Sequence, residues 1–170
     1  EFARCTTAVY DYDRACAWEW NNYAGGYMRL WYYNTSGYGP YVKDYVTTPE
    51  IEFEAGVLYS VQLTPLSYES GTTKAASIDL LLGQGDDPRT FQVLAAYTGL
   101  PYIGIPNDSH VKTCEFVVPS SGSYRLSLLG KEKFAKVYNF QVFRLGQSAR
   151  PEAPADFVVT PDASGAASEI

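Results

Sequence analysis

The chain is a succession of short strand-like runs separated by turn residues, and this pattern constrains its fold more than any other feature. Residues 50–54 alternate between glutamate and apolar residues, which places Ile51 and Phe53 on one face and the glutamates on the other. After a turn, residues 57–64 form a second strand whose Tyr59, Val61 and Leu63 share a face. Each such strand has one buried and one wet face, which is typical of antiparallel sheets.

Five further strands are expected. Residues 27–33 read YMRLWYY, so Met28, Leu30 and Tyr32 should lie on one face. The others are expected at 76–83, 110–118, 122–129 and 135–144, with residues 120–122 as a hairpin connection between the third and fourth of the five. Roughly nine to eleven short strands, with turns every 8–12 residues or so, predict an all-β protein. For this length, a two-sheet antiparallel β-sandwich of the jelly-roll type fits best.

One segment carries a helical signal. Asp87 suits an N-cap and Pro88 suits the first helical position, so a helix is expected over residues 88–97. Its buried face would hold Val93, Leu94 and Tyr97. The fold is therefore expected to contain at most one short helix.

The composition changes after residue 145. Residues 146–155 contain Pro151 and Pro154 and are typical of an interdomain linker. Residues 156–170 begin with one strand-like run, and a single strand has no sheet of its own. We therefore expect a first domain over 1–145, a linker over 146–155, and the first strand of a truncated second domain over 156–170. The chain also begins without an initiator methionine, which we interpret as a processed or trimmed fragment of a larger protein.

Charge and hydropathy exclude two classes of partner. The formal net charge is −6 and the isoelectric point is near 4.7. Nucleic-acid binding requires clustered lysine and arginine, which this chain lacks. No run approaches the roughly 20 apolar residues of a membrane span.

Three cysteines, Cys5, Cys16 and Cys114, leave at least one thiol unpaired, and their spacing matches no zinc or thioredoxin motif. Cys5 and Cys16 can pair if their segments form a hairpin; alternatively, they are small buried hydrophobes. With a single histidine, His110, no Cys–His nucleophile can be assigned.

Three stretches of the first 145 residues carry recognisable motifs: 11–20 (DYDRACAWEW), 44–61 (DYVTTPEIEFEAGVLYSV) and 115–124 (EFVVPSSGSY). They resemble the cleaved-adhesin-like jelly-roll surface domains of Bacteroidetes-type bacteria, and together they place about residues 1–145 in that family. Residues 151–165 resemble the first strand of a fibronectin type III domain. The resemblance implies a secreted or surface-attached multidomain protein.

The resemblance also bears on calcium. Some members of that family bind calcium through acidic residues of the opening loop and an aspartate on the last strand. Here the opening loop offers Asp11 and Asp13, while Tyr138 stands where the family has the aspartate. Calcium prefers six to eight oxygen ligands. The two readings are a calcium site at Asp11 and Asp13, or solvated turn residues with no cofactor.

Aromatic residues suggest a ligand-binding face. Tyrosine is abundant, with 15 Tyr against 8 Phe and 3 Trp. The face of the 27–33 strand opposite Met28 and Leu30 is expected to be exposed. We predict that a glycan would contact it through Trp31, Tyr33, Arg29, Tyr27 and Tyr38. The alternative is packing, and Trp18 and Trp20, which share a face, are assigned to the core.

Catalysis is not indicated by the acidic residues. Capping explains Asp87, and Glu50, Glu52 and Glu54 line an exposed strand face. From the sequence, we expect no carboxyl group in an apolar setting that would tune it as a general acid. The predicted function is a non-catalytic adhesion or carbohydrate-binding module, monomeric in itself, whose partner is a glycan or a host or cell-surface protein. The alternative is a structural spacer or a protein–protein interaction domain without a small ligand.

Overall fold

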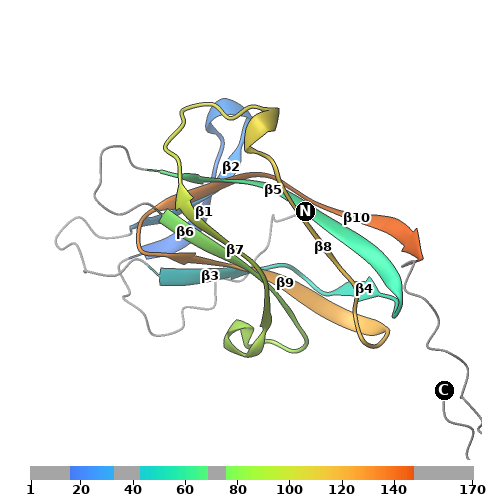
Figure 1. Cartoon of the computed structure of the whole chain (residues 1–170). Coiled ribbons are helices and arrows are strands. Elements are labelled where there is room, and N and C mark those ends of the chain that lie inside the picture. The colour runs from blue at the N-terminus through green and yellow to red at the C-terminus, as the bar shows by residue number, and fades with distance from the viewer. Residues whose placement is uncertain (1–15, 33–42, 69–75, 148–170) are drawn as a thin grey trace, which may run out of the picture.

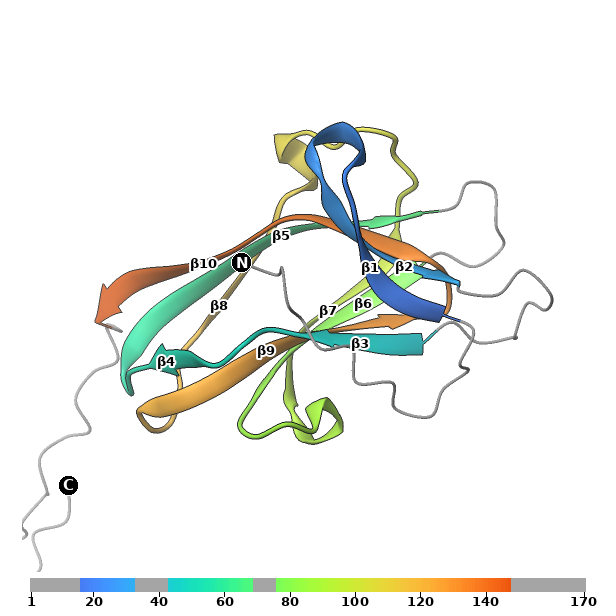
Figure 2. The same cartoon turned by 180° about the vertical axis from the view of Figure 1, so that it is seen from behind.

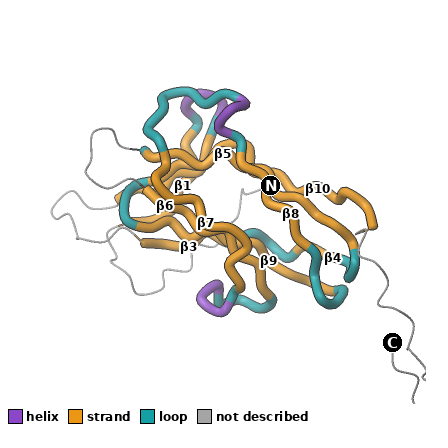
Figure 3. Tube along the Cα trace, in the orientation of Figure 1, coloured by secondary structure: helices purple, strands orange, loops and turns teal. Residues whose placement is uncertain are grey.

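The computed structural model describes residues 16–32, 43–68 and 76–147, and it confirms an all-β sandwich. Within these ranges, ten strands form two antiparallel sheets that pack face to face (Figures 1 and 2). The helical content of the described residues is three short 3-10 turns, which Figure 3 shows in purple. None of these turns is long and apolar enough to cross a membrane.

The two sheets draw their strands from distant parts of the chain. The first sheet has the order β1 (Cys16–Asn21), β2 (Tyr27–Tyr32), β10 (Ala135–Gln147), β5 (Val57–Ser67) and β8 (Lys112–Phe116). The second has the order β3 (Lys43–Thr47), β9 (Gly122–Lys131), β6 (Ala76–Gly83) and β7 (Gln92–Leu100). The short strand β4 (Ile51–Phe53) pairs with the first residues of β9, whereas β3 pairs with its last residues.

The core lies between the sheets and follows the predicted alternation. Phe53 is 2% exposed, and its ring meets the rings of Tyr59 and Phe116 edge-on, with centroids 4.6 and 5.3 Å apart. Edge-to-face contacts of this kind are favourable beyond the area they bury. Met28 and Leu30 are buried on the inner face of β2, as predicted. The period of two in the sequence therefore placed the core faces correctly.

The predicted helix over residues 88–97 is wrong. Asp87 does cap, since its Oδ1 accepts from the backbone N–H of Arg89 at 3.0 Å, but the helix is a single 3-10 turn, η2 (Pro88–Thr90). The chain then runs as β7, paired with β6. Backbone pairing along β6 decides the conformation here, and a capping signal has no influence beyond the first turn. Leu94 and Tyr97 pack against the core, whereas Val93 is 48% exposed.

The predicted hairpin at residues 120–122 is also wrong. β8 pairs with β5 in the first sheet, and β9 pairs with β3, β4 and β6 in the second. The connection therefore crosses from one sheet to the other. Val118 is 2% exposed, so it is buried within the crossing segment, and the hydroxyl of Tyr124 donates to the carbonyl oxygen of Ser120 at 2.9 Å. Turn residues predict a reversal of direction, but they do not say which sheet receives the next strand.

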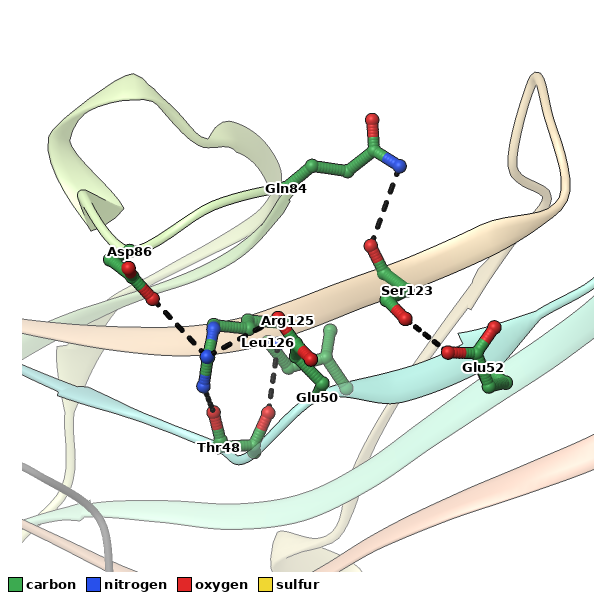
Figure 4. Close-up of polar contacts among 8 residues, drawn as sticks. All are labelled: Thr48, Glu50, Glu52, Gln84, Asp86, Ser123, Arg125 and Leu126. Atoms are coloured by element: carbon green, nitrogen blue, oxygen red, sulfur yellow. Dashed lines mark hydrogen bonds and ion pairs between the residues drawn. The ribbon is translucent and has the colours of Figure 1, made fainter.

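Polar contacts tie the turns to the second sheet (Figure 4). Arg125 on β9 donates to the carbonyl oxygen of Thr48 at 3.2 Å and forms ion pairs with Glu50 at 3.4 Å and Asp86 at 3.2 Å. Leu126 N donates to Thr48 Oγ1 at 3.0 Å. Glu50 and Asp86 are well exposed, so these carboxylates act as surface partners of an arginine.

Two predictions fall partly outside the described residues. Cys114 carries a free, half-buried thiol that packs against the core. Cys5 lies outside the described part of the chain, so a Cys5–Cys16 pair stays a prediction. β10 continues to Gln147, two residues beyond the expected domain end at 145. The rest of the linker, and the strand expected in 156–170, are not described.

Candidate ligand-binding surface

The β1–β2 hairpin carries two exposed aromatic side chains at its tip. Trp20 is 57% exposed, and Tyr23, in the turn η1 (Tyr23–Gly25), is 73% exposed. The assignment of Trp20 to the core is therefore wrong, although Trp18, on the same face, is 4% exposed. Trp18 pairs with Leu30 within the sandwich, whereas Trp20 pairs with Met28 nearer the tip. Figure 2 shows this tip projecting away from the second sheet, which explains the difference.

Local contacts hold the Trp20 indole in place. A Cβ atom on Gly26 would lie 2.3 Å from Cζ2 of Trp20, so only glycine leaves room for the ring there. The indole Nε1 donates to Asn22 Oδ1 at 2.6 Å. The neighbouring Asn21 accepts from the backbone N–H of Tyr23 at 2.8 Å. The tip is thus a short, hydrogen-bonded structure that presents an aromatic ring to solvent.

Tyr27 is 5% exposed, so the prediction that it faces solvent is wrong. It does lie on the outer face of the first sheet, but there it packs with Leu66 and Tyr138, and Tyr68 and Ile103 join the cluster. The ring centroids of Tyr27 and Tyr138 are 4.7 Å apart. The covering residue Ile103 belongs to the loop between β7 and β8.

Lys136 lies at the centre of this cluster and is 5% exposed. Its Nζ donates to the carbonyl oxygens of Ile103 at 2.6 Å and Gly104 at 3.4 Å. It also stands over three tyrosine rings, 5.8 Å from the centroid of Tyr27 and 5.7 Å from those of Tyr102 and Tyr138. Desolvation lowers the pKa of Lys136, and burial, followed by the nearby Tyr68, raises the pKa of Tyr27 to about 12.

Arg29 lies on the outer face of β2, as predicted, and is half-buried. It forms an ion pair with Glu19 across the hairpin. Its Nη1 donates to the hydroxyl of Tyr68 at 2.9 Å, and its guanidinium lies 5.5 Å from the centroid of the Tyr68 ring. The charge of Arg29 is therefore engaged within the protein, and its predicted contact with a ligand stays a prediction.

The β7–β8 loop lies at the same end of the molecule as the hairpin tip (Figure 1), and it carries two exposed side chains. Tyr102 is 53% exposed and Ile105 is 73% exposed. We call the set Trp20, Tyr23, Tyr102 and Ile105 the crest. Burial is the main cause that raises the pKa of Tyr138, and Tyr23 contributes to the rise. The Lys136 ammonium lies over the rings of both Tyr102 and Tyr138, so both halves of the crest border the same buried cluster.

The remaining predicted residues are not placed. Trp31 pairs with Ala17 through the backbone, but its side chain is outside the described part, as are Tyr33, Tyr38, Asp11 and Asp13. Within the described ranges, no three His, Cys, Asp or Glu side chains gather to hold a metal ion. The calcium prediction therefore stays a prediction. One sequence feature could have indicated the hairpin half of the crest. Trp20, Tyr23 and Gly26 lie close together in the sequence, which is typical of a turn that carries aromatic side chains.

Fold and surface define a class: a two-sheet jelly-roll sandwich that displays aromatic side chains from its loops. No family model matches the chain, and no curated protein matches it. Among solved structures, it shares the fold of a cleaved adhesin domain of Lys-gingipain from Porphyromonas gingivalis, with a TM-score of 0.58 and 12% identity over 84% of this chain and 90% of that one.

Two other similar structures are carbohydrate-binding modules. TmCBM61 in complex with β-1,4-galactotriose has a TM-score of 0.48 and 13% identity, covering 85% of this chain and 90% of that one. The module of Cellvibrio mixtus lichenase 5A in complex with cellotriose has a TM-score of 0.40 and 10% identity, covering 81% and 96%. At 12% identity, the similarity to the adhesin domain, with its TM-score of 0.58, establishes the fold alone.

Proposed function

We propose that this domain is a non-catalytic carbohydrate-binding or adhesion module of a secreted or cell-surface protein, and that its crest contacts the glycan. The observation that carries the proposal is the exposed indole of Trp20, seated on Gly26 and tethered through Nε1 to Asn22 at 2.6 Å. A ring held in this way loses little conformational freedom when a ligand stacks on it, so more of the contact energy is retained as affinity.

The chemistry of the crest suits a sugar. Flat aromatic rings pack against the apolar C–H faces of pyranoses, and neighbouring amide and hydroxyl groups bind sugar hydroxyls. Asn21, Asn22 and the exposed hydroxyl-bearing ring of Tyr23 provide such groups beside Trp20. Exposed apolar groups that cluster at one end of a soluble domain commonly mark a binding surface.

We propose a non-catalytic role because the carboxylate next to Trp20 in the chain is already bound by an arginine of the same hairpin. Glycosidases use two carboxyl groups that face each other across the scissile bond. Glu19, the carboxylate of the hairpin, is instead bound by Arg29. The fold shared with an adhesin domain supports the same class of function and a location outside the cell.

A protein-binding or spacer role is the second candidate, and one observation favours it. Ile105 is aliphatic and 73% exposed, and an aliphatic side chain suits an apolar protein contact better than a sugar hydroxyl. Under this alternative, the crest binds a surface protein and gives no response to glycans.

The test is a tryptophan-fluorescence titration of the chain against soluble xylan, β-1,4-galactan, laminarin, mannan and mixed-linkage β-glucan. We expect a saturable shift with at least one of them. Trp20→Ala should weaken binding by about tenfold or more, which corresponds to about 1.4 kcal/mol, while Trp20→Phe retains most of it.

Two controls complete the test. Val93→Ala, on the opposite sheet and 48% exposed, should bind like the parent. Trp31→Ala tests the surface predicted from the sequence. Binding lost in Trp31→Ala but kept in Trp20→Ala would move the site away from the crest, and no shift with any polysaccharide would favour the protein-binding role.

A further inference from the structure

The β7–β8 loop is held by a backbone hydrogen bond at its start and by a side-chain cap near its end, whereas its middle is held by a lysine. At the start, the backbone N–H of Ser67 donates to the carbonyl oxygen of Pro101 at 2.9 Å, and Ser67 and Tyr102 form a parallel bridge. At the end, Asn107 caps the turn η3 (Asp108–His110). Between them, the carbonyl oxygens of Ile103 and Gly104 point to the ammonium of Lys136.

We propose that Lys136 is the positioning residue of the crest: its ammonium fastens residues 103–104 to the outer face of the first sheet, so that Tyr102 and Ile105 are presented beside the hairpin tip. The second part of this inference, a consequence for ligand binding, rests on the proposed function. The first part, a fixed loop, does not.

The surroundings of Lys136 explain why a lysine suits this place. A buried ammonium is costly unless its donors are satisfied. Here two carbonyl oxygens accept from it, and the faces of three tyrosine rings attract the cation. No carboxylate among the described residues forms an ion pair with it. Its ammonium is therefore directed to the loop backbone rather than to an acidic side chain.

The position of Tyr102 depends on the same contact. The Lys136 ammonium lies over the Tyr102 ring as well as over the buried rings of Tyr27 and Tyr138. Tyr102 itself is 53% exposed. Ile103 packs into the cluster next to it. If the ammonium is removed, the two carbonyl oxygens can turn to water, and Tyr102 loses the cation that ties it to the buried rings.

A purely space-filling role for the Lys136 stem is the competing explanation, and Lys136→Met separates the two. Methionine has a similar length and apolar body but no donor. We expect Lys136→Met to remain folded, while the backbone order parameters of Gly104 and Ile105 fall from about 0.85 to below about 0.6. Lys136→Arg, which keeps charge and donors, should restore most of the order. Lys112→Met, an exposed lysine on β8, is the matched control and should leave the loop unchanged.

The binding consequence is tested with a double-mutant cycle, using xylan, β-1,4-galactan and laminarin as probes. We expect Tyr102→Ala and Lys136→Met to weaken binding to a similar extent, by about three- to tenfold. The double variant should lose less binding free energy than the sum of the two single losses, because both changes remove the contact of Tyr102 with the probe.

The two parts of the inference fail separately. Unchanged order parameters in Lys136→Met would overturn the positioning role, whatever the probes do. A loosened loop, together with no probe bound by the parent, would support the positioning role while the proposed glycan function fails. Fully additive losses in the double variant would overturn the link between Lys136 and Tyr102.

Discussion

Trp18 is joined to Asp44 by two hydrogen bonds that link the edges of the two sheets. The indole Nε1 of Trp18 donates to the carbonyl oxygen of Asp44 at 3.0 Å, and its backbone N–H donates to Oδ2 at 3.3 Å. Oδ1 accepts from the backbone N–H of Tyr45 at 2.8 Å. Asp44 is 5% exposed, so the expectation that no carboxyl group lies in an apolar setting is wrong for this residue. Its carboxylate accepts from a backbone N–H of the edge strand β1.

Asp44 should make stability fall with pH in the mildly acidic range. Desolvation raises its pKa from 3.8 to about 6, although the N–H groups of Tyr45 and Trp18 oppose the rise. Between these values the folded protein holds a proton that the unfolded chain has released, so the free energy of unfolding decreases as pH rises. The contribution is fully present below pH 3.8 and is lost above about pH 6; it amounts to about 3 kcal/mol at most.

Urea unfolding of the parent and Asp44→Asn between pH 3.5 and about 7 would measure this effect. The variant should lose the decline, at a constant cost of about 1–3 kcal/mol for an N–H left without its acceptor. Glu54→Gln is a useful control, because Arg144 lowers the pKa of Glu54, so its contribution is lost as pH falls instead. A decline of the same size in Asp44→Asn would show that another group causes it.

Gly26→Ala should displace the Trp20 ring. The new Cβ would lie 2.3 Å from Cζ2 of Trp20, at a backbone φ of +90°. With a ψ of 139°, this is a sparsely populated conformation that costs about 1–3 kcal/mol for a residue with a side chain. Gly25→Ala is a close control, because its φ is +87° and its Cβ would meet nothing within 4 Å. We expect both variants to be destabilised, but only Gly26→Ala should change the tryptophan fluorescence and weaken glycan binding. Identical spectra for the two variants would show that Gly26 does not position the Trp20 ring.

Gly130→Ala tests how closely the sheets approach each other. A Cβ on Gly130 would lie 2.5 Å from Cδ2 of Leu30 and 3.1 Å from Cζ2 of Trp18, both within the core. Overpacking of this kind costs about 1–3 kcal/mol. Thermal unfolding should show a lower midpoint for Gly130→Ala than for Gly104→Ala, where the new Cβ meets nothing within 4 Å. Equal midpoints would mean that the sheets can separate at no cost.

The Cys114 thiol should react slowly in the folded protein. Burial raises its pKa, and the neighbouring Glu115 raises it further, so the thiolate fraction near neutral pH is small. Peptide-level mass spectrometry after iodoacetamide treatment should show alkylation at least about tenfold slower than in urea. Equal rates in the two solvents would show that the β8 edge opens readily.

Part of this fold could be predicted from the sequence because the determining forces are local. Alternation with a period of two depends on the pleat of one strand, so the inward positions of Phe53, Tyr59 and Met28 follow from neighbours in the chain. The cap at Asp87 is equally local, and it was predicted correctly even though the helix after it was not.

The candidate site depends on forces that the sequence does not display. Trp18 and Trp20 are two residues apart on one face of β1, yet only Trp18 is buried. The reason is that the tip of the β1–β2 hairpin extends beyond the second sheet. Tyr27 lies on the outer face, where the sequence predicts exposure, but a loop more than 70 positions later in the chain covers it. The sequence by itself determined which side of each strand is apolar. Only the tertiary structure decided which of those sides meets another segment and which meets water, because burial is set by distant segments.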